Sequence, residues 1–159
     1  MVWGKTIQVF AIGTDGLMQN FSYDPSNCTN GLKGWCAPWA MPQGAVRLGP
    51  SSGVAVMPWN NNTTIQLFAV GSDGLMQNYS YSPSNASCTS RGWCAPWSMP
   101  EGSLPALSAS SGVAAIPWYN TIQLFAITAN YNGPKVQNFS YNPVNCTSGL
   151  YGWCAPWLM

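Results

Sequence analysis

The chain has 159 residues, of which 47% are hydrophobic and 13% aromatic, so it has enough apolar surface for the core of an ordinary domain. Charged residues make up only 6% of the chain and the net charge is +1, whereas an average domain is roughly 25% charged. Because the chain has no basic stripe to neutralise phosphates, we expect no nucleic-acid partner. No apolar run approaches the roughly eighteen residues of a membrane span.

One segment occurs three times, with a period close to 58 residues that is set by the spacing of Gln8, Gln66 and Gln123. The copies cover about residues 1–49, 50–107 and 108–159, which together form a single repeat domain over 1–159. Fixed periods of this size are typical of repeat architectures such as propellers and solenoids.

Each copy contains four short segments that alternate in hydrophobicity with a period of two, which is typical of β-strands. In the second copy these segments cover residues 52–59, 64–71, 75–81 and 92–99. The first copy has only residues 1–3 in place of the first segment, and we expect a partner to contact that edge.

Tight turns are predicted between the second and third segments. Asp15-Gly16 and Asp73-Gly74 suit a hairpin that needs positive φ, and the third copy has a longer turn at residues 130–134. The two aspartates occupy the same turn position, so we interpret them as turn formers and not as catalysts.

Four antiparallel strands per repeat predict an all-β β-propeller with three four-stranded blades in this chain. A β-trefoil and a β-solenoid are the alternatives. Propellers close with about four to eight blades, so three blades cannot form a ring alone. We therefore expect a homodimer that closes a ring of six blades.

The six cysteines form three close pairs, one in each copy. The predicted disulfides are Cys28 with Cys36, Cys88 with Cys94, and Cys146 with Cys154. Zinc is the alternative, but the chain has no His and no CxxC pair. Disulfides persist in oxidising compartments, so we expect a secreted, extracellular protein, although no signal peptide is visible at the start of this sequence.

Eight N-x-S/T sequons are consistent with a glycoprotein. The candidate glycosylation sites are Asn20, Asn27, Asn61, Asn62, Asn78, Asn85, Asn138 and Asn145.

The inventory for acid and base catalysis is nearly empty, since the chain has no His, one Glu (Glu101) and three Asp. Glycoside hydrolysis would need a pair of carboxylates at the scissile bond. We expect neither an enzyme nor a cofactor or metal site.

Repeated aromatic and amide side chains suit carbohydrate, because sugar C–H faces stack on aromatic rings and hydroxyl groups pair with amides. The candidate sugar-binding residues are Trp59, Trp118, Gln8, Gln66, Gln123, Tyr23, Tyr81, Tyr141, Trp35, Trp93 and Trp153. Each of them could serve the core instead, and for Trp39, Trp97 and Trp157 we favour the core. A glycan on Asn20, Asn78 or Asn138 would block such a site.

The strand motifs W-x-x-x-T-I-Q-L-F, G-L-M-Q-N-Y-S-Y and G-W-C-A-P-W together resemble the fucose-binding six-bladed propeller lectins of fungi and bacteria, some of which assemble from several short chains. Tectonin-like propeller lectins, with D-G turns and Trp-rich strands, are similar to the same degree. The first resemblance aligns Gln8, Gln66 and Gln123 with the sugar-clamping Arg of that family, and it aligns the sequon residues Asn20, Asn78 and Asn138 with its Glu.

The leading hypothesis is a lectin with multivalent sites between blades, which binds glycans or glycoproteins. A structural, self-assembling extracellular glycoprotein is the alternative, and a protein-binding scaffold is a third hypothesis.

Overall fold

The computed structural model describes residues 1–29, 33–89, 91–99, 104–129, 132–146 and 151–159. These residues form twelve β-strands and no helix. The described part of the chain therefore has no helix that could span a membrane. The strands group into three four-stranded antiparallel sheets, which we name blades 1, 2 and 3 in chain order. The prediction of three four-stranded blades is confirmed.

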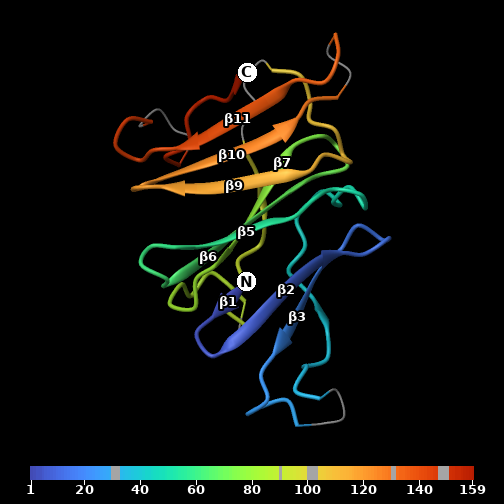
Figure 1. The fold of residues 1–159 in the computed structure, drawn as a ribbon, viewed down its shortest axis with the longest axis vertical. Helices are drawn as coiled ribbons and strands as arrows, with labels where there is room; N and C mark the ends of the chain where they lie inside the picture. Colours follow the sequence, from blue (N-terminus) through green and yellow to red (C-terminus); the bar gives the residue numbers. More distant parts are fainter. Residues whose placement is uncertain (30–32, 90, 100–103, 130–131, 147–150) are drawn as a thin grey trace.

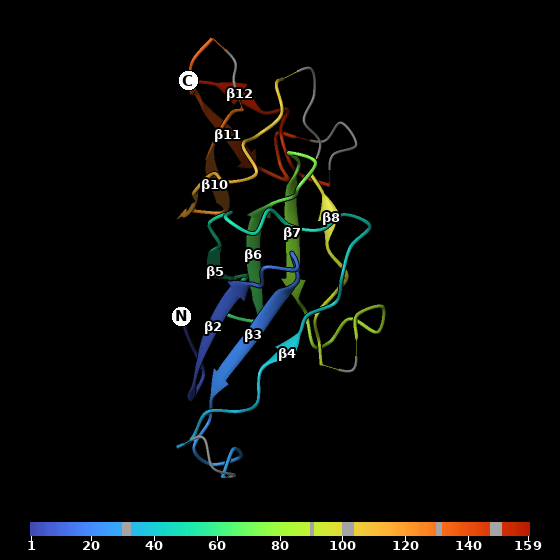
Figure 2. The same ribbon diagram turned by 90° about the vertical axis from the view of Figure 1, so that its right-hand side faces the viewer.

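Within each blade the strands lie side by side in chain order. Blade 1 contains β1 (Val2–Trp3), β2 (Thr6–Ile12), β3 (Met18–Tyr23) and β4 (Trp39–Ala40). Blade 2 contains β5 (Ala55–Trp59), β6 (Thr64–Val70), β7 (Met76–Tyr81) and β8 (Trp97–Ser98). Blade 3 contains β9 (Val113–Trp118), β10 (Thr121–Ile127), β11 (Val136–Tyr141) and β12 (Trp157–Leu158). The blades succeed one another along the long axis of the molecule (Figure 1), and Figure 2 shows the same succession from the side.

Two strands of blade 2 are shorter than the sequence predicted by more than one residue. The first strand of blade 2 begins at Ala55 instead of Ser52, because the Ser52 hydroxyl accepts a hydrogen bond from the Val70 amide and takes the place of a backbone partner. The fourth strand is reduced to Trp97–Ser98, preceded by an isolated bridge between Trp93 and Tyr81.

The aspartates of the predicted turns behave as turn formers. The carboxylates of Asp15 and Asp73 accept the amides of Leu17 and Leu75 at 3.1 and 3.0 Å. Gly74 has a φ of 82°, and a Cβ there would lie 2.9 Å from the Leu107 carbonyl oxygen of the segment that leads to blade 3. The longer turn predicted at 130–134 includes residues 130 and 131, which lie outside the described residues.

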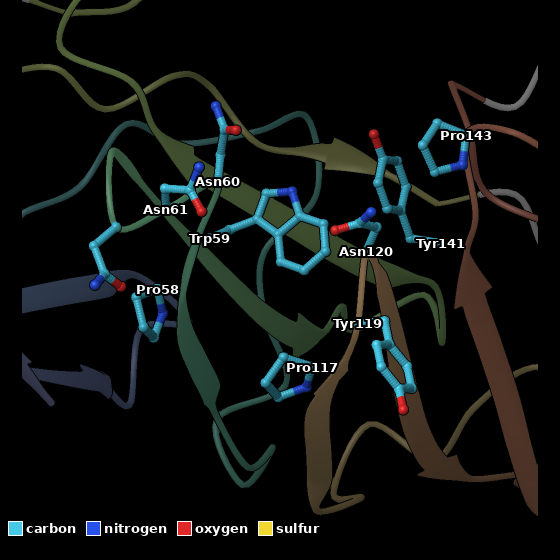
Figure 3. A pocket seen from close by; sticks show the side chains of 10 residues that line it. Pro58, Trp59, Asn60, Asn61, Pro117, Tyr119, Asn120, Tyr141 and Pro143 are labelled. Atoms are coloured by element: carbon cyan, nitrogen blue, oxygen red, sulfur yellow. The ribbon is translucent and has the colours of Figure 1, made fainter.

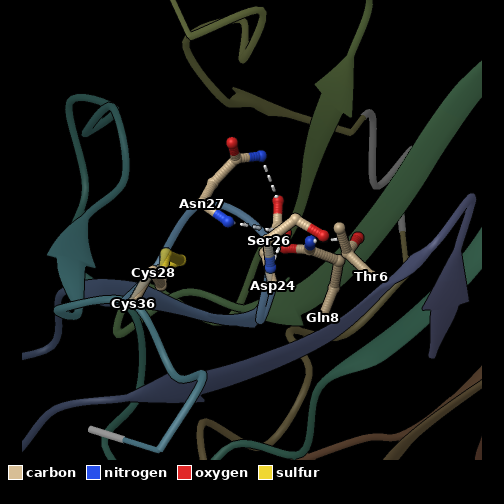
Figure 4. Close-up of a disulfide and its surroundings, with 7 residues drawn as sticks. All are labelled: Thr6, Gln8, Asp24, Ser26, Asn27, Cys28 and Cys36. Carbon is tan, nitrogen blue, oxygen red and sulfur yellow. Dashed lines mark hydrogen bonds between the residues drawn. A yellow bond between two sulfur atoms is a disulfide. The ribbon is translucent and has the colours of Figure 1, made fainter. Parts of the chain in front are cut away.

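All three predicted disulfides are present. They exclude the zinc alternative, since no cysteine is free to act as a ligand. Each disulfide closes the loop between the third and fourth strands. In blade 1, Asp24 holds this loop by accepting the amides of Ser26 and Asn27, both at 3.2 Å, next to the Cys28–Cys36 bond (Figure 4).

The core lies between the blades, because one face of each blade packs on the opposite face of the next. The core between blades 1 and 2 contains Met18, Met41, Leu48, Ile65, Leu67, Ala69, Tyr79 and Trp93. The core between blades 2 and 3 contains the equivalent Met76, Met99 and Leu107 from blade 2 with Ile122, Leu124 and Ala126 from blade 3.

The two outer blades each leave one apolar face uncovered. On blade 1, Ile7 is 41% and Trp35 37% exposed, whereas their equivalents in blade 2, Ile65 and Trp93, are 2% and 4% exposed. The opposite face is uncovered on blade 3, where Ile116, Trp118, Ile127 and Trp157 are exposed. Equivalent side chains are therefore buried where a neighbouring blade covers them and exposed where none does.

Tyr79 allows a test of the core through pH. Burial raises the pKa of its phenol to about 12, while an unfolded tyrosine ionises near pH 10. Between these values the unfolded chain releases a proton that the folded chain keeps, so the free energy of unfolding falls as pH rises. Tyr79→Phe introduces the residue that blades 1 and 3 have at this position, Phe21 and Phe139. Near pH 11 the fall in its free energy of unfolding should be about 1 kcal/mol smaller than in wild type. Chemical denaturation of both proteins at about pH 8 and pH 11 measures it, and equal losses would contradict the prediction.

Candidate functional site

A pocket of about 240 Å³ lies between blades 1 and 2. Blade 1 lines it with Trp3, Gln8, Asn20 and Trp39, and blade 2 lines it with Ile65, Tyr81, Arg91 and Trp93. Tyr81 connects the two walls, since its ring centroid lies 5.9 Å from that of Trp3 and 5.5 Å from that of Trp93.

An equivalent pocket of about 480 Å³ lies between blades 2 and 3. Its walls are formed by Trp59, Asn60, Thr64, Gln66, Asn78, Ser80, Ser82 and Asn85 from blade 2 and by Ile122, Tyr141 and Trp153 from blade 3. Trp59, Gln66, Asn78, Ile122, Tyr141 and Trp153 repeat residues of the first pocket at the same positions of the repeat.

A second cleft of about 560 Å³ adjoins this pocket and shares Trp59, Asn60 and Tyr141 with it. Figure 3 shows Trp59 at its centre, with Tyr141 across from it and Tyr119 below. The turn beside Trp59 is left-handed over residues 60–62, a conformation that Asn tolerates better than most residues. The accessible surface near Trp59 is therefore larger than the pocket alone.

The sheet register places the side chains of each pocket. Trp59 ends β5, Gln66 lies in β6 opposite Ser80, and Tyr81 ends β7. Gly92 permits the bridge between Tyr81 and Trp93, because its φ is 76° and a Cβ there would lie 2.7 Å from the Tyr81 ring. The side chains that recur in both pockets thus lie on strands or on an isolated bridge to one.

An amide pair forms the polar floor of each pocket. Asn20 donates to the Gln8 side-chain oxygen at 3.0 Å, and Gln8 donates to the Thr6 hydroxyl at 2.8 Å. In blade 2, Asn78 donates to the Gln66 side-chain oxygen at 3.0 Å. The Gln66 oxygen is thus engaged within the sheet, and its amide nitrogen can donate to a ligand in the pocket. The asparagines are buried, so the glutamines present this polar group at the surface of the pocket.

Seven of the eleven sequence-predicted sugar-binding residues meet in these pockets, drawn from two neighbouring blades in each case. Gln8, Tyr81 and Trp93 meet in the first, and Trp59, Gln66, Tyr141 and Trp153 meet in the second with Trp59 also lining the adjoining cleft. Tyr23 and Trp35 lie instead on the uncovered side of blade 1, and Trp118 and Gln123 on that of blade 3. The structure does not bring these four together within one chain.

Sequence reasoning did not select Trp3, Trp39 or Arg91 as site residues. Trp3 had a signal, because it repeats as Trp59 and Trp118. Trp39 was assigned to the core, and it does pack against the core while also lining the pocket. Arg91 had no such signal, because its equivalents are Lys33 and Tyr151.

The eight sequons divide by burial. The candidates Asn20, Asn78 and Asn138 are 3%, 4% and 2% exposed, and each donates its amide nitrogen to a glutamine, so the fold has no room for a glycan there. We therefore predict that these three candidates carry no glycan. The other five candidates, Asn27, Asn61, Asn62, Asn85 and Asn145, are exposed.

No protein-family model and no curated protein sequence matches this chain. Among solved structures, it is similar to the BP39L lectin from Burkholderia pseudomallei, with a TM-score of 0.66 and 15% sequence identity over 97% of this chain. The fold is that of a β-propeller. This propeller segment spans 37% of the length of the BP39L chain.

The burial of three sequon asparagines and the exposure of the other five predict which of them carry N-glycans. For the chain secreted from a eukaryotic host, peptide mapping by mass spectrometry should find N-glycans only on the exposed asparagines. Asn20, Asn78 and Asn138 should be unmodified, because a glycan there would break the amide pair and force the sheet open. A glycan on Asn78 in folded, secreted protein would contradict the prediction.

Proposed function

We propose that the chain is a lectin, a carbohydrate-binding protein, whose saccharide sites lie between neighbouring blades. The observation that carries this proposal is the repeated pocket, in which a Trp and a Gln from one blade face a Tyr and a Trp from the next. Concave sites with aromatic walls and a few fixed polar groups are typical of small-molecule and saccharide binding. The printed description of the similar BP39L protein as a lectin supports the proposal.

The second pocket illustrates how a sugar would be held. The indole of Trp59 offers an apolar surface on which the C–H face of a pyranose can stack. The Gln66 amide nitrogen donates to a sugar hydroxyl, and the Ser80 hydroxyl and Asn60 amide can each donate or accept. Because Trp59, Gln66 and Ser80 are fixed on strands, little of their conformational entropy is lost when the sugar binds.

The proposed activity is binding without a chemical step. No Asp or Glu is among the described residues that line the two pockets. The carboxylates of Asp15 and Asp73 are engaged in turns, and that of Asp24 holds the disulfide loop. This arrangement supports recognition and offers no carboxylate pair for glycoside hydrolysis.

We propose further that two chains close a ring of six blades. Blade 3 presents the face that blades 1 and 2 use to bind their successors, and blade 1 presents the face that receives a predecessor. A second copy is therefore the occupant that fits, since it repeats a contact already made twice within the chain. Such apolar faces rarely stay open to water in a monomer.

The same closure would complete a third kind of pocket. Trp118, Gln123 and Asn138 of blade 3 correspond to Trp59, Gln66 and Asn78, while Tyr23 and Trp35 of blade 1 correspond to Tyr81 and Trp93. These halves lie on the two uncovered faces, so a site forms only when one chain meets another. A closed dimer would hold six sites in all, and such repetition raises avidity for dense glycans.

The alternative, a self-assembling structural glycoprotein, would use the same two faces in an open series of chains. Either assembly is proposed to be extracellular, because three disulfides are present and five sequons are exposed. The repeated pockets favour the lectin, since an open structural series has no need for aromatic clefts between its blades.

A glycan array tests the lectin proposal. The wild-type chain, with its N-glycans removed so that none fills a pocket, should bind a restricted set of saccharides. Trp3→Ala combined with Trp59→Ala should lower binding by roughly tenfold or more, because it removes the stacking surface from both complete pockets. Trp3→Phe with Trp59→Phe is the matched control that keeps an aromatic ring. Circular dichroism verifies that each variant is folded, and a wild-type chain that binds no saccharide at high density would overturn the proposal.

A further inference from the structure

The two complete pockets differ in charge. Arg91 lines the pocket between blades 1 and 2, whereas no charged side chain is among the described residues that line the pocket between blades 2 and 3. Charged residues are only 6% of the chain, so a cation inside a pocket is a marked departure from the surrounding surface.

The difference arises at one position of the repeat, immediately before the Gly-Trp pair of the fourth segment. Lys33, Arg91 and Tyr151 occupy it in the three copies. The Arg91 guanidinium carbon lies 4.6 Å from the ring centroid of Trp39 in blade 1. The Tyr151 ring lies 5.7 Å from that of Trp97 in blade 2. Both side chains therefore reach back to the equivalent Trp of the preceding blade.

No carboxylate in the described part of the chain neutralises the guanidinium group of Arg91. Its contact is with the ring of Trp39, and among the described residues no ion pair joins it to an acid. Asp24 is held by Asn27 at 2.7 Å, and Asp73 is bonded to its own turn. Because an indole ring attracts the charge and supplies no oxygen acceptor, this contact leaves the N–H donors of Arg91 able to bind an anion at the exposed edge of the pocket.

We infer that the pocket between blades 1 and 2 selects an anionic saccharide, one that bears a carboxylate or a sulfate, whereas the pocket between blades 2 and 3 takes a neutral one. The inference rests on the proposed lectin function and assigns its ligand class. The edge of a guanidinium group donates two parallel hydrogen bonds to a carboxylate, and such charge-assisted bonds are stronger than neutral ones. The sugar ring would stack on Trp3 while its anionic group meets Arg91.

The repeat itself supplies the test variant. Arg91→Tyr installs the residue that blade 3 carries at this position, so the exposed substitution is compatible with the fold. Arg47→Tyr is the matched control, because it makes the same change of charge at an exposed arginine outside both pockets. The probes are sialylated, glucuronate-bearing and sulfated oligosaccharides, each with its neutral parent, in a surface binding assay at low and high salt.

Wild type and Arg47→Tyr should bind at least one anionic probe about tenfold more tightly than its neutral parent, and salt should reduce that preference. Arg91→Tyr should lose the preference, whereas neutral saccharides should still bind in the pocket between blades 2 and 3, which Arg91 does not line. The probe that responds separates a carboxylate ligand from a sulfate ligand. An anionic preference that Arg91→Tyr leaves unchanged, or binding to neutral saccharides alone in wild type, would overturn the inference while the lectin proposal stands. Failure of wild type to bind any saccharide would overturn both.

Discussion

Each joint between blades depends on a pair of aromatic contacts that cross it. Between blades 1 and 2, Trp3 meets Tyr81 at 5.9 Å and Phe10 meets Trp93 at 5.5 Å, both edge to face. The same two contacts recur between blades 2 and 3 at 5.8 Å each, made by Trp59 with Tyr141 and by Phe68 with Trp153. Such pairs contribute about 0.5–1.5 kcal/mol each beyond the apolar area that they bury. Because Trp59 and Tyr141 also line the proposed site, the contact that joins two blades is the contact that shapes the pocket.

This dependence on joints explains why the chain exposes so much apolar surface at its ends. Blade 2 is covered on both faces, and its strand β6 is buried from Leu67 to Val70. Blades 1 and 3 have one partner each, so Ile7 and Trp118 are exposed although their equivalents in other blades are covered. The chain thus has two uncovered apolar faces, one on blade 1 and one on blade 3. The proposed ring would cover both with one kind of contact.

The sequence predicted the blades and the disulfides because both are local properties of one repeat. Alternating segments and close cysteine pairs lie within fifty to sixty residues of one another and recur three times, and the Asp-Gly turn recurs in two of the copies. The pockets were harder to predict, because each takes its walls from different copies. Gln66 and Trp93 belong to the same copy of the repeat, yet they line different pockets. The structure places Gln66 in a pocket with Trp153, and Gln8 in a pocket with Trp93. Burial of the sequon asparagines was also hidden, since it follows from the side-chain pair that Asn78 makes with Gln66 across two strands.

The mass of the wild-type protein in solution is the most direct test of whether the uncovered faces of blades 1 and 3 pair between two chains. Sedimentation equilibrium of the deglycosylated chain over a wide concentration range should give one species of twice the 17.1 kDa chain mass, because two arcs leave no face uncovered when they meet. A stable monomer would contradict the proposed ring, since the exposed faces of blades 1 and 3 would then need no partner. A series of masses that grows with concentration would contradict it as well, because it would show that the joints repeat without closing.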